Sequence, residues 1–155
     1  MPFRIAAVLG FLFAFTASAQ AAQVCAWMVE SEEADNQRIL TIWLQSDTDL
    51  HFLYKVGGKG IMSGTDRMSS PGSGTYILKA GKADKPWTFG ATLYPPGKID
   101  VTMELHQMPA MVTSNEVTPI LAQFAFTRDV PESEGKPPAT FMKKQCATVA
   151  ATAPH

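Results

Sequence analysis

Short segments of alternating apolar and polar residues run through most of the chain. Alternation over about four to eight residues is typical of a β-strand with one buried face, and β-branched and aromatic residues are common in the same segments. No segment shows the periodicity of an amphipathic helix of ordinary length. We therefore predict seven strands, at residues 24–30, 38–46, 50–56, 74–79, 88–94, 99–108 and 120–128.

Turn-forming residues separate these strands. Glycine, proline, aspartate and serine are concentrated at residues 46–49, 57–60, 69–74, 80–86 and 95–97. Residues 129–138 combine proline, glycine and charge, which predicts an exposed loop. We expect residues 147–155 to form a flexible, frayed tail.

Alternation also predicts the core, because successive side chains of a strand point to opposite faces of the sheet. The predicted inward rows are Leu40, Ile42 and Leu44; Phe52, Tyr54 and Val56; Ile99, Val101, Met103 and Leu105; and Ile120, Ala122, Phe124 and Phe126. The row opposite Ile99–Leu105 contains Asp100, Thr102, Glu104, His106 and Met108. We expect Trp43 to fill the core as well. Strands of this number and spacing predict an all-β, immunoglobulin-like antiparallel β-sandwich rather than a closed barrel.

The amino-terminal residues have the composition of a secretory signal. Arg4 precedes an apolar run from Ile5 to Phe15, and small residues follow. The run is about 11 residues, roughly half of what a membrane-spanning helix needs. We therefore predict a signal peptide at 1–21, cleaved after Ala19 or Ala21, and a periplasmic protein with no membrane insertion after cleavage.

Cys25 and Cys146 are the only cysteines of the chain. In an oxidising compartment, such a pair predicts a disulfide that joins the first strand to the C-terminal segment. We therefore expect one sandwich domain at 22–146, closed by this bond. Free thiols for metal or redox chemistry are the alternative, but the sequence has no Cys-x-x-Cys motif.

The charge balance argues against nucleic acid or anionic lipid as the main partner. Removing Arg4 leaves 12 Lys and Arg residues against 14 Asp and Glu residues, a net charge of −2 (12 − 14). We expect a monomer without a cofactor.

A His/Met cluster makes copper binding an alternative function. His106 and Met108 share a face of their predicted strand, and Met111 follows closely. Thioether and imidazole ligands together suit copper, above all Cu(I). His51 and Met62 could contribute further ligands.

Catalytic motifs are not found in the sequence, and we expect no enzyme. The chain has no Gly-x-Ser-x-Gly nucleophile motif. The glycine cluster at 57–60 lacks the Ser or Thr that follows the lysine of a phosphate-binding loop. The loop aspartates lack the spacing of a calcium-binding loop.

An exposed sheet edge is the third candidate site. Open sandwiches have edge strands that can pair with another extended chain through main-chain hydrogen bonds. The glycine-rich segment 55–73 is predicted to lie at a sheet margin. The side chains that we expect to bind a partner there are Lys55, Lys59, Asp66 and Arg67.

The middle of the chain resembles the curli-chaperone family. The resemblance rests on the aromatic and glycine-rich segment 53–60, on Ser63 and Met68, and on the strands at 89–93 and 99–105. It implies a small, exported, immunoglobulin-like protein that keeps amyloid subunits of curli-type fibres from assembling too early. We therefore expect a periplasmic chaperone that holds an exported fibre subunit. Copper binding and a structural or interaction module of the cell envelope remain the alternatives.

Overall fold

A computed structural model describes residues 21–32, 37–62, 65–68, 72–92, 96–109, 117–130, 140–141 and 144–150 of the chain. Its strands are β1 (Ala21–Glu32), β2 (Gln37–Ser46), β3 (Leu50–Met62), β4 (Thr65–Met68), β5 (Gly72–Leu78), β6 (Ala83–Thr92), β7 (Gly97–Gln107), β8 (Ile120–Val130), β9 (Thr140–Phe141) and β10 (Gln145–Ala150). None of these described residues belongs to a helix long and apolar enough to cross a bilayer.

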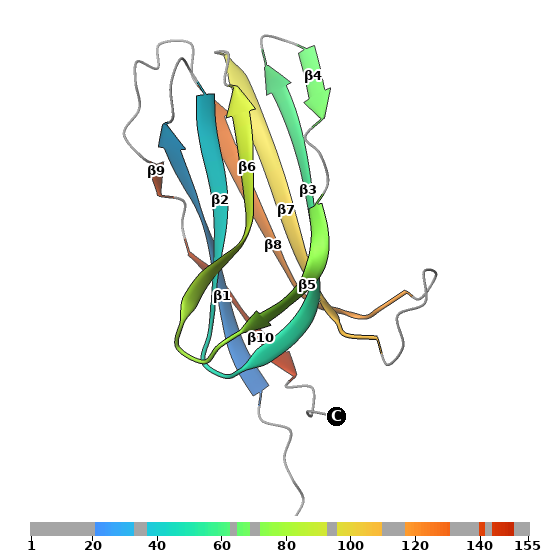
Figure 1. Ribbon diagram of the computed structural model, residues 1–155. Helices are drawn as coiled ribbons and strands as arrows, with labels where there is room; N and C mark the ends of the chain where they lie inside the picture. Colours follow the sequence, from blue (N-terminus) through green and yellow to red (C-terminus); the bar gives the residue numbers. More distant parts are fainter. Residues whose placement is uncertain are drawn as a thin grey trace, which may run out of the picture.

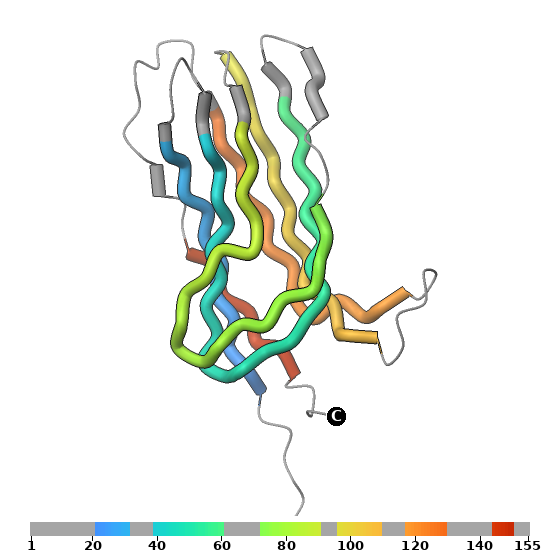
Figure 2. Tube along the Cα trace, viewed as in Figure 1, coloured from blue at the N-terminus to red at the C-terminus, as the bar shows by residue number. Residues whose placement is uncertain are grey.

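The strands form two antiparallel sheets that pack face to face (Figures 1 and 2). Sheet A has the order β10-β1-β2-β6, and β9 also pairs with β1. Sheet B has the order β4-β3-β7-β8, and β5 also pairs with β3. The series β1-β2-β6 and β3-β7-β8 match the A-B-E and C-F-G strands of immunoglobulin-like sandwiches. The predicted fold class is therefore confirmed.

All seven predicted strands are present, but the glycine cluster at 57–60 is not a turn. It lies inside β3, where residues 57–60 pair with residues 99–102 of β7. Pairing along this strongly alternating neighbour outweighs the weak strand preference of glycine. The predicted turn at 80–86 is also shorter than expected, because β6 already begins at Ala83.

Residues 147–150 do not form part of a frayed tail as predicted. They belong to β10, which pairs with the first residues of β1, Ala21–Ala26. Cys25 and Cys146 are directly opposite each other in this pairing and form the predicted disulfide. Val149 is only 1% exposed, so β10 also contributes to the core. The remaining predicted tail and the signal segment up to residue 20 lie outside the described residues.

The core between the sheets consists largely of the predicted inward rows. The rows of β2 and β7 are buried over their whole predicted lengths, as are Phe52 and Val56 of β3, and Tyr54 packs against them. β1 adds a further row of Ala22, Val24, Ala26 and Met28, each with no exposed surface.

One prediction at the β7–β8 pairing is wrong. Leu105 pairs with Ala122, but His106 pairs with Ile120, so Leu121 is an extra residue in β8. Such a bulge changes which face a side chain points to. As a result, Ile120 is 55% exposed although a core position was predicted. His106 remains on the face of Glu104, as predicted, but it is only 5% exposed, and Thr118 lies against its ring.

Trp43 does not fill the core as predicted. It alternates with the buried Ile42 and Leu44 and therefore lies on the outer face of sheet A. There it stacks on Trp27 of β1, with ring centroids 6.3 Å apart. Lys85 lies over the Trp43 ring and Lys144 over the Trp27 ring, at 6.0 and 5.0 Å from the centroids.

Candidate surface for an extended chain

The outer face of sheet B carries three parallel rows of side chains that cross β3, β7 and β8. Every residue in them is exposed or half-buried. Two rows each run from a cation through an anion to a neutral polar residue, and the row between them has small residues. The rows are Lys55, Glu104 and Gln123; Gly57, Thr102 and Ala125; and Lys59, Asp100 and Thr127.

A shallow hollow lies at the β3 end of the small-residue row. Its volume is about 260 Å³, and its lining includes Lys55, Gly57, Thr102 and Glu104. A Cβ atom added at Gly57 would meet no other atom within 4 Å, so the missing side chain leaves open space above the sheet. The hollow therefore lies beside the charged row of Lys55 and Glu104.

The acidic flank at Asp100 is held in its charged form. Thr127 Oγ1 donates a hydrogen bond to Asp100 Oδ1 at 2.7 Å, and Lys98 Nζ lies 3.2 Å from Oδ2. These interactions, the threonine hydrogen bond first, lower the pKa of the Asp100 carboxyl below its ordinary value of 3.8. Asp100 therefore stays an anion beside Lys59 at neutral pH.

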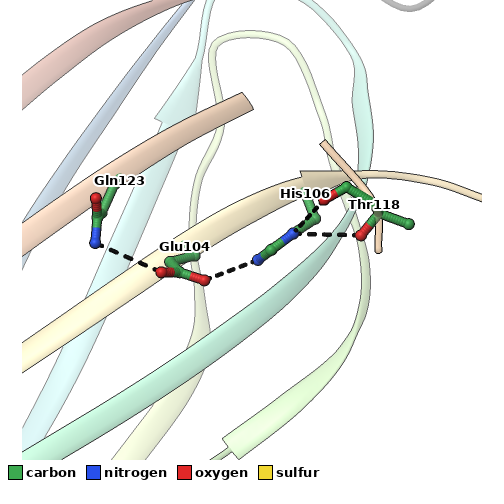
Figure 3. Close-up of polar contacts among 4 residues, drawn as sticks. All are labelled: Glu104, His106, Thr118 and Gln123. Carbon is green, nitrogen blue, oxygen red and sulfur yellow. Dashed lines mark hydrogen bonds and ion pairs between the residues drawn. The ribbon is translucent and has the colours of Figure 1, made fainter. Parts of the chain in front are cut away.

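The acidic flank at Glu104 is held by a buried histidine (Figure 3). His106 Nε2 lies 2.9 Å from Glu104 Oε2, and Gln123 Nε2 donates to Glu104 Oε1 at 3.5 Å. His106 Nδ1 lies 3.3 Å from Thr118 Oγ1 and 3.1 Å from the Thr118 carbonyl oxygen. Thr118 is only 7% exposed, so its side chain is buried instead of facing a ligand. The hydrogen-bond network connects the segment before β8 to the outer face of sheet B.

The small-residue row ends on β8, the outermost strand of sheet B on that side. At this edge, Ala125 is hydrogen-bonded by a side chain instead of a strand. Gln145 Nε2 donates to the Ala125 carbonyl oxygen at 2.5 Å, and the Ala125 N–H donates to Gln145 Oε1 at 3.4 Å. Since main-chain direction alternates along a strand, the N–H and C=O groups of Gln123 and Thr127 point to the same edge.

The other sheet margins are less suited to pairing. β6 contains Pro86 within a register shift opposite Trp43, and a proline at such a position blocks edge pairing. The margin of sheet A beyond β1 is made of the short strands β9 and β10, and that of sheet B beyond β3 is divided between β4 and β5. β8 has 11 residues and no proline, so it is the longest continuous edge in the described part of the chain.

The predicted partner-binding residues divide between a face and a margin. Lys55 and Lys59 lie on β3, which has neighbours on both sides, so the expectation that they line an edge is wrong. They lie on the outer face of sheet B, on the side of β3 opposite to the buried Val56. The main chain of Asp66 and Arg67 does lie at that margin, on β4.

The copper residues are only partly brought together. Both ring nitrogens of His106 already have polar partners. Met62 pairs with Gly97, nine residues along β7 from His106, which is roughly 30 Å at the rise of a strand. His51 and Met108 lie closer to His106 in the sheet. His51 is two residues from Leu53, which pairs with His106, and Met108 directly follows β7. Met111 lies outside the described residues. Among the described residues no group of three or more His, Cys, Asp or Glu side chains could hold a metal ion.

Sequence reasoning did not find Gln145 or Thr118. Gln145 precedes a cysteine in a segment without clear alternation, so no pattern indicated that its amide reaches the opposite sheet. The position of Thr118 depends on the bulge in β8, and the sequence carries no signal for that bulge.

No family model, curated protein or solved structure matches the chain.

Proposed function

We propose that this protein is a periplasmic, chaperone-like binding module that pairs with an extended segment of another exported polypeptide. The partner class is an aggregation-prone fibre subunit of the curli type. The single observation that carries the proposal is the long β8 edge, whose Ala125 main-chain groups point out of sheet B and bind a planar amide.

Main-chain pairing at β8 provides affinity without a catalytic motif. An extended segment can add to an exposed edge as a further strand. Its main-chain N–H and C=O groups then take the place of solvent at that edge. Cross-β fibres grow by the same pairing between identical segments. A segment held on β8 is therefore withheld from fibre growth.

The outer face of sheet B supplies selectivity beside this edge. Charged flanks at Lys55 with Glu104 and at Lys59 with Asp100 border the small-residue row that leads to Ala125. Because both signs are present on each flank, the surface favours a partner with little net charge over a strongly charged one. In this proposal Lys55 and Lys59 contribute to the binding surface from β3, which is separated from the β8 edge by β7.

A fibrillation assay tests this proposal. Mature protein, added below equimolar ratio, is expected to lengthen the lag of curli-subunit fibre formation followed with an amyloid dye. Ala125→Pro removes the edge N–H and places a ring where the partner strand would lie, so it should abolish the delay. Pairing with β7 is preserved, because the Ala125 main chain points away from that strand.

The control variant is Val117→Pro, which places the same ring in the segment before β8, at a residue that is 95% exposed. Circular dichroism checks that both variants retain strand structure. No delay by the wild-type protein at equimolar ratio would contradict the chaperone function. A full delay by folded Ala125→Pro would show that the partner does not use β8.

A further inference from the structure

We infer that Gln145 is an intramolecular plug of the β8 edge, which an incoming extended segment must displace. The inference rests on the proposed function and deepens it by naming the residue that regulates access. After displacement, the Ala125 N–H and C=O groups bind the main chain of a foreign strand.

The geometry of the plug imitates strand pairing. In a hydrogen-bonded antiparallel pair, one residue both donates its N–H and accepts through its C=O to the residue opposite. The Gln145 amide reproduces this pattern with one donor and one acceptor, at 2.5 and 3.4 Å from the Ala125 oxygen and nitrogen. The site is therefore already occupied by the chemical group that a partner strand would bring.

The plug is held in place by the opposite sheet. Gln145 is the first residue of β10 and pairs with Ala26 of β1. The next residue, Cys146, is disulfide-bonded to Cys25, and Val149 anchors the strand in the core. β10 therefore keeps the amide close to β8 through contacts that do not involve β8 pairing.

A plug of this kind protects the edge without closing it. An unprotected long edge pairs with other copies of the same chain, which is why edge strands carry blocking features. Within the described residues, the hydrogen bonds of the Gln145 amide to β8 are made to Ala125. Further along the strand, the Asp129 carbonyl accepts a hydrogen bond from the Arg128 guanidinium. A segment that also pairs with Gln123 and Thr127 forms more main-chain hydrogen bonds than the two that it displaces.

Amide hydrogen exchange tests the plug directly on the full mature protein. Gln145→Met retains the length of the side chain but removes both hydrogen bonds, and Gln145→Ala removes the side chain as well. In both variants the Ala125 amide should exchange about tenfold faster than in the wild type, as expected for the loss of two hydrogen bonds. The amides of Phe124 and Phe126, which face β7, should be unchanged. Thr148→Ala, an exposed position on the same strand, is the control.

The fibrillation assay with a curli-type subunit then tests displacement. Without its competitor, the edge should bind more tightly, so Gln145→Met should reach a given delay at roughly a tenth of the wild-type concentration. Unchanged exchange at Ala125 would overturn the plug. Faster exchange with unchanged or weaker inhibition would overturn its competing role and leave the proposed function standing.

Two further outcomes distinguish the plug from the proposed function, and a foreign strand at the β8 edge from a second copy of this chain. Faster exchange of Ala125 together with no inhibition by the wild-type protein would remove the proposed function and leave the plug supported. Light scattering reports self-association. If Gln145→Met dimerises without any gain in inhibition, the occupant is a second copy of this chain, and the assignment to a foreign strand is wrong.

Discussion

Asp49 illustrates how a single carboxylate organises one end of the sandwich. Its two oxygens accept hydrogen bonds from Lys79 Nζ at 2.7 Å and from the Ala80 N–H at 2.9 Å. Gly81 follows with a φ of 71°, which glycine adopts without strain, and its N–H donates to the Ser46 carbonyl oxygen at 2.7 Å. Asp49 therefore joins the turn between β2 and β3 to the turn after β5, which is distant from it in the sequence.

This contact predicts an acid-dependent loss of stability. The hydrogen bond from Lys79, followed by that from Ala80, lowers the pKa of Asp49 below its ordinary value of 3.8. A carboxyl with a lowered pKa in the folded state stabilises the protein above its unfolded pKa, and the effect disappears as the pH falls through the folded value. Urea unfolding should therefore show falling stability below about pH 4.

Asp49→Asn should make this dependence shallower. It should not remove the dependence, because the pKa values of Asp84 and Asp100 are lowered in the same direction. Lys144→Ala, which removes an exposed lysine that contacts Gln45 and none of these three carboxylates, serves as the control. If the Asp49→Asn variant kept the wild-type slope below about pH 4, the assignment would be contradicted.

At the scale of the element, β10 contributes more than its length suggests. It continues sheet A beyond β1, buries Val149 and presents Gln145 to β8. β10 has six residues and lies at the margin of sheet A, where it pairs with β1. The Cys25–Cys146 bond ties it to β1 across 121 positions of the sequence.

The disulfide is therefore predicted to make a large contribution to stability. Closing a loop of about 120 residues restricts the unfolded chain, and the chain-entropy relation gives about 4 to 5 kcal/mol. The double variant Cys25→Ser/Cys146→Ser should lose about this free energy of unfolding in urea. Wild-type protein unfolded in the presence of a reductant should lose a similar amount. A loss below about 1 kcal/mol in both would show that β10 is held by pairing and burial alone.

At the scale of the whole molecule, a buried ion pair links the two sheets. Arg128 of β8 donates from Nε to Glu30 Oε2 of β1 at 2.7 Å, and the two residues are 8% and 2% exposed. Both follow the inward rows of their strands, so their charges meet inside the sandwich. The pair fixes the position of β8 relative to β1, and with it the relation between the edge and β10.

Breaking this pair on one side should be costly. Arg128→Met leaves the Glu30 carboxylate buried without the guanidinium, which typically costs about 3 to 5 kcal/mol. Replacing both residues with methionine should recover most of the loss, because neither charge of the pair then remains in the core. Chemical unfolding of the single and double variants measures the difference. Lys98→Ala, which removes an exposed partner of Asp100, should cost less than about 1 kcal/mol. A double variant no more stable than Arg128→Met would contradict this account.

Local sequence patterns were sufficient to predict the sandwich, most of its inward rows and its disulfide. Alternation is a local property, and rows such as Leu40–Leu44 and Ile99–Leu105 are buried because their period matches the geometry of a strand. The paired cysteines required only their number and the compartment implied by the signal segment.

The positions of the edge strands and the departures from alternation follow from contacts that are distant in the sequence. Gly57 is in a strand because β7 pairs with it, and Ile120 is exposed because Leu121 is an extra residue in β8. Gln145 meets Ala125 through contacts between opposite sheets, 20 residues apart in the sequence. Such contacts depend on register and strand order, which arise from long-range pairing and leave no local pattern in the sequence.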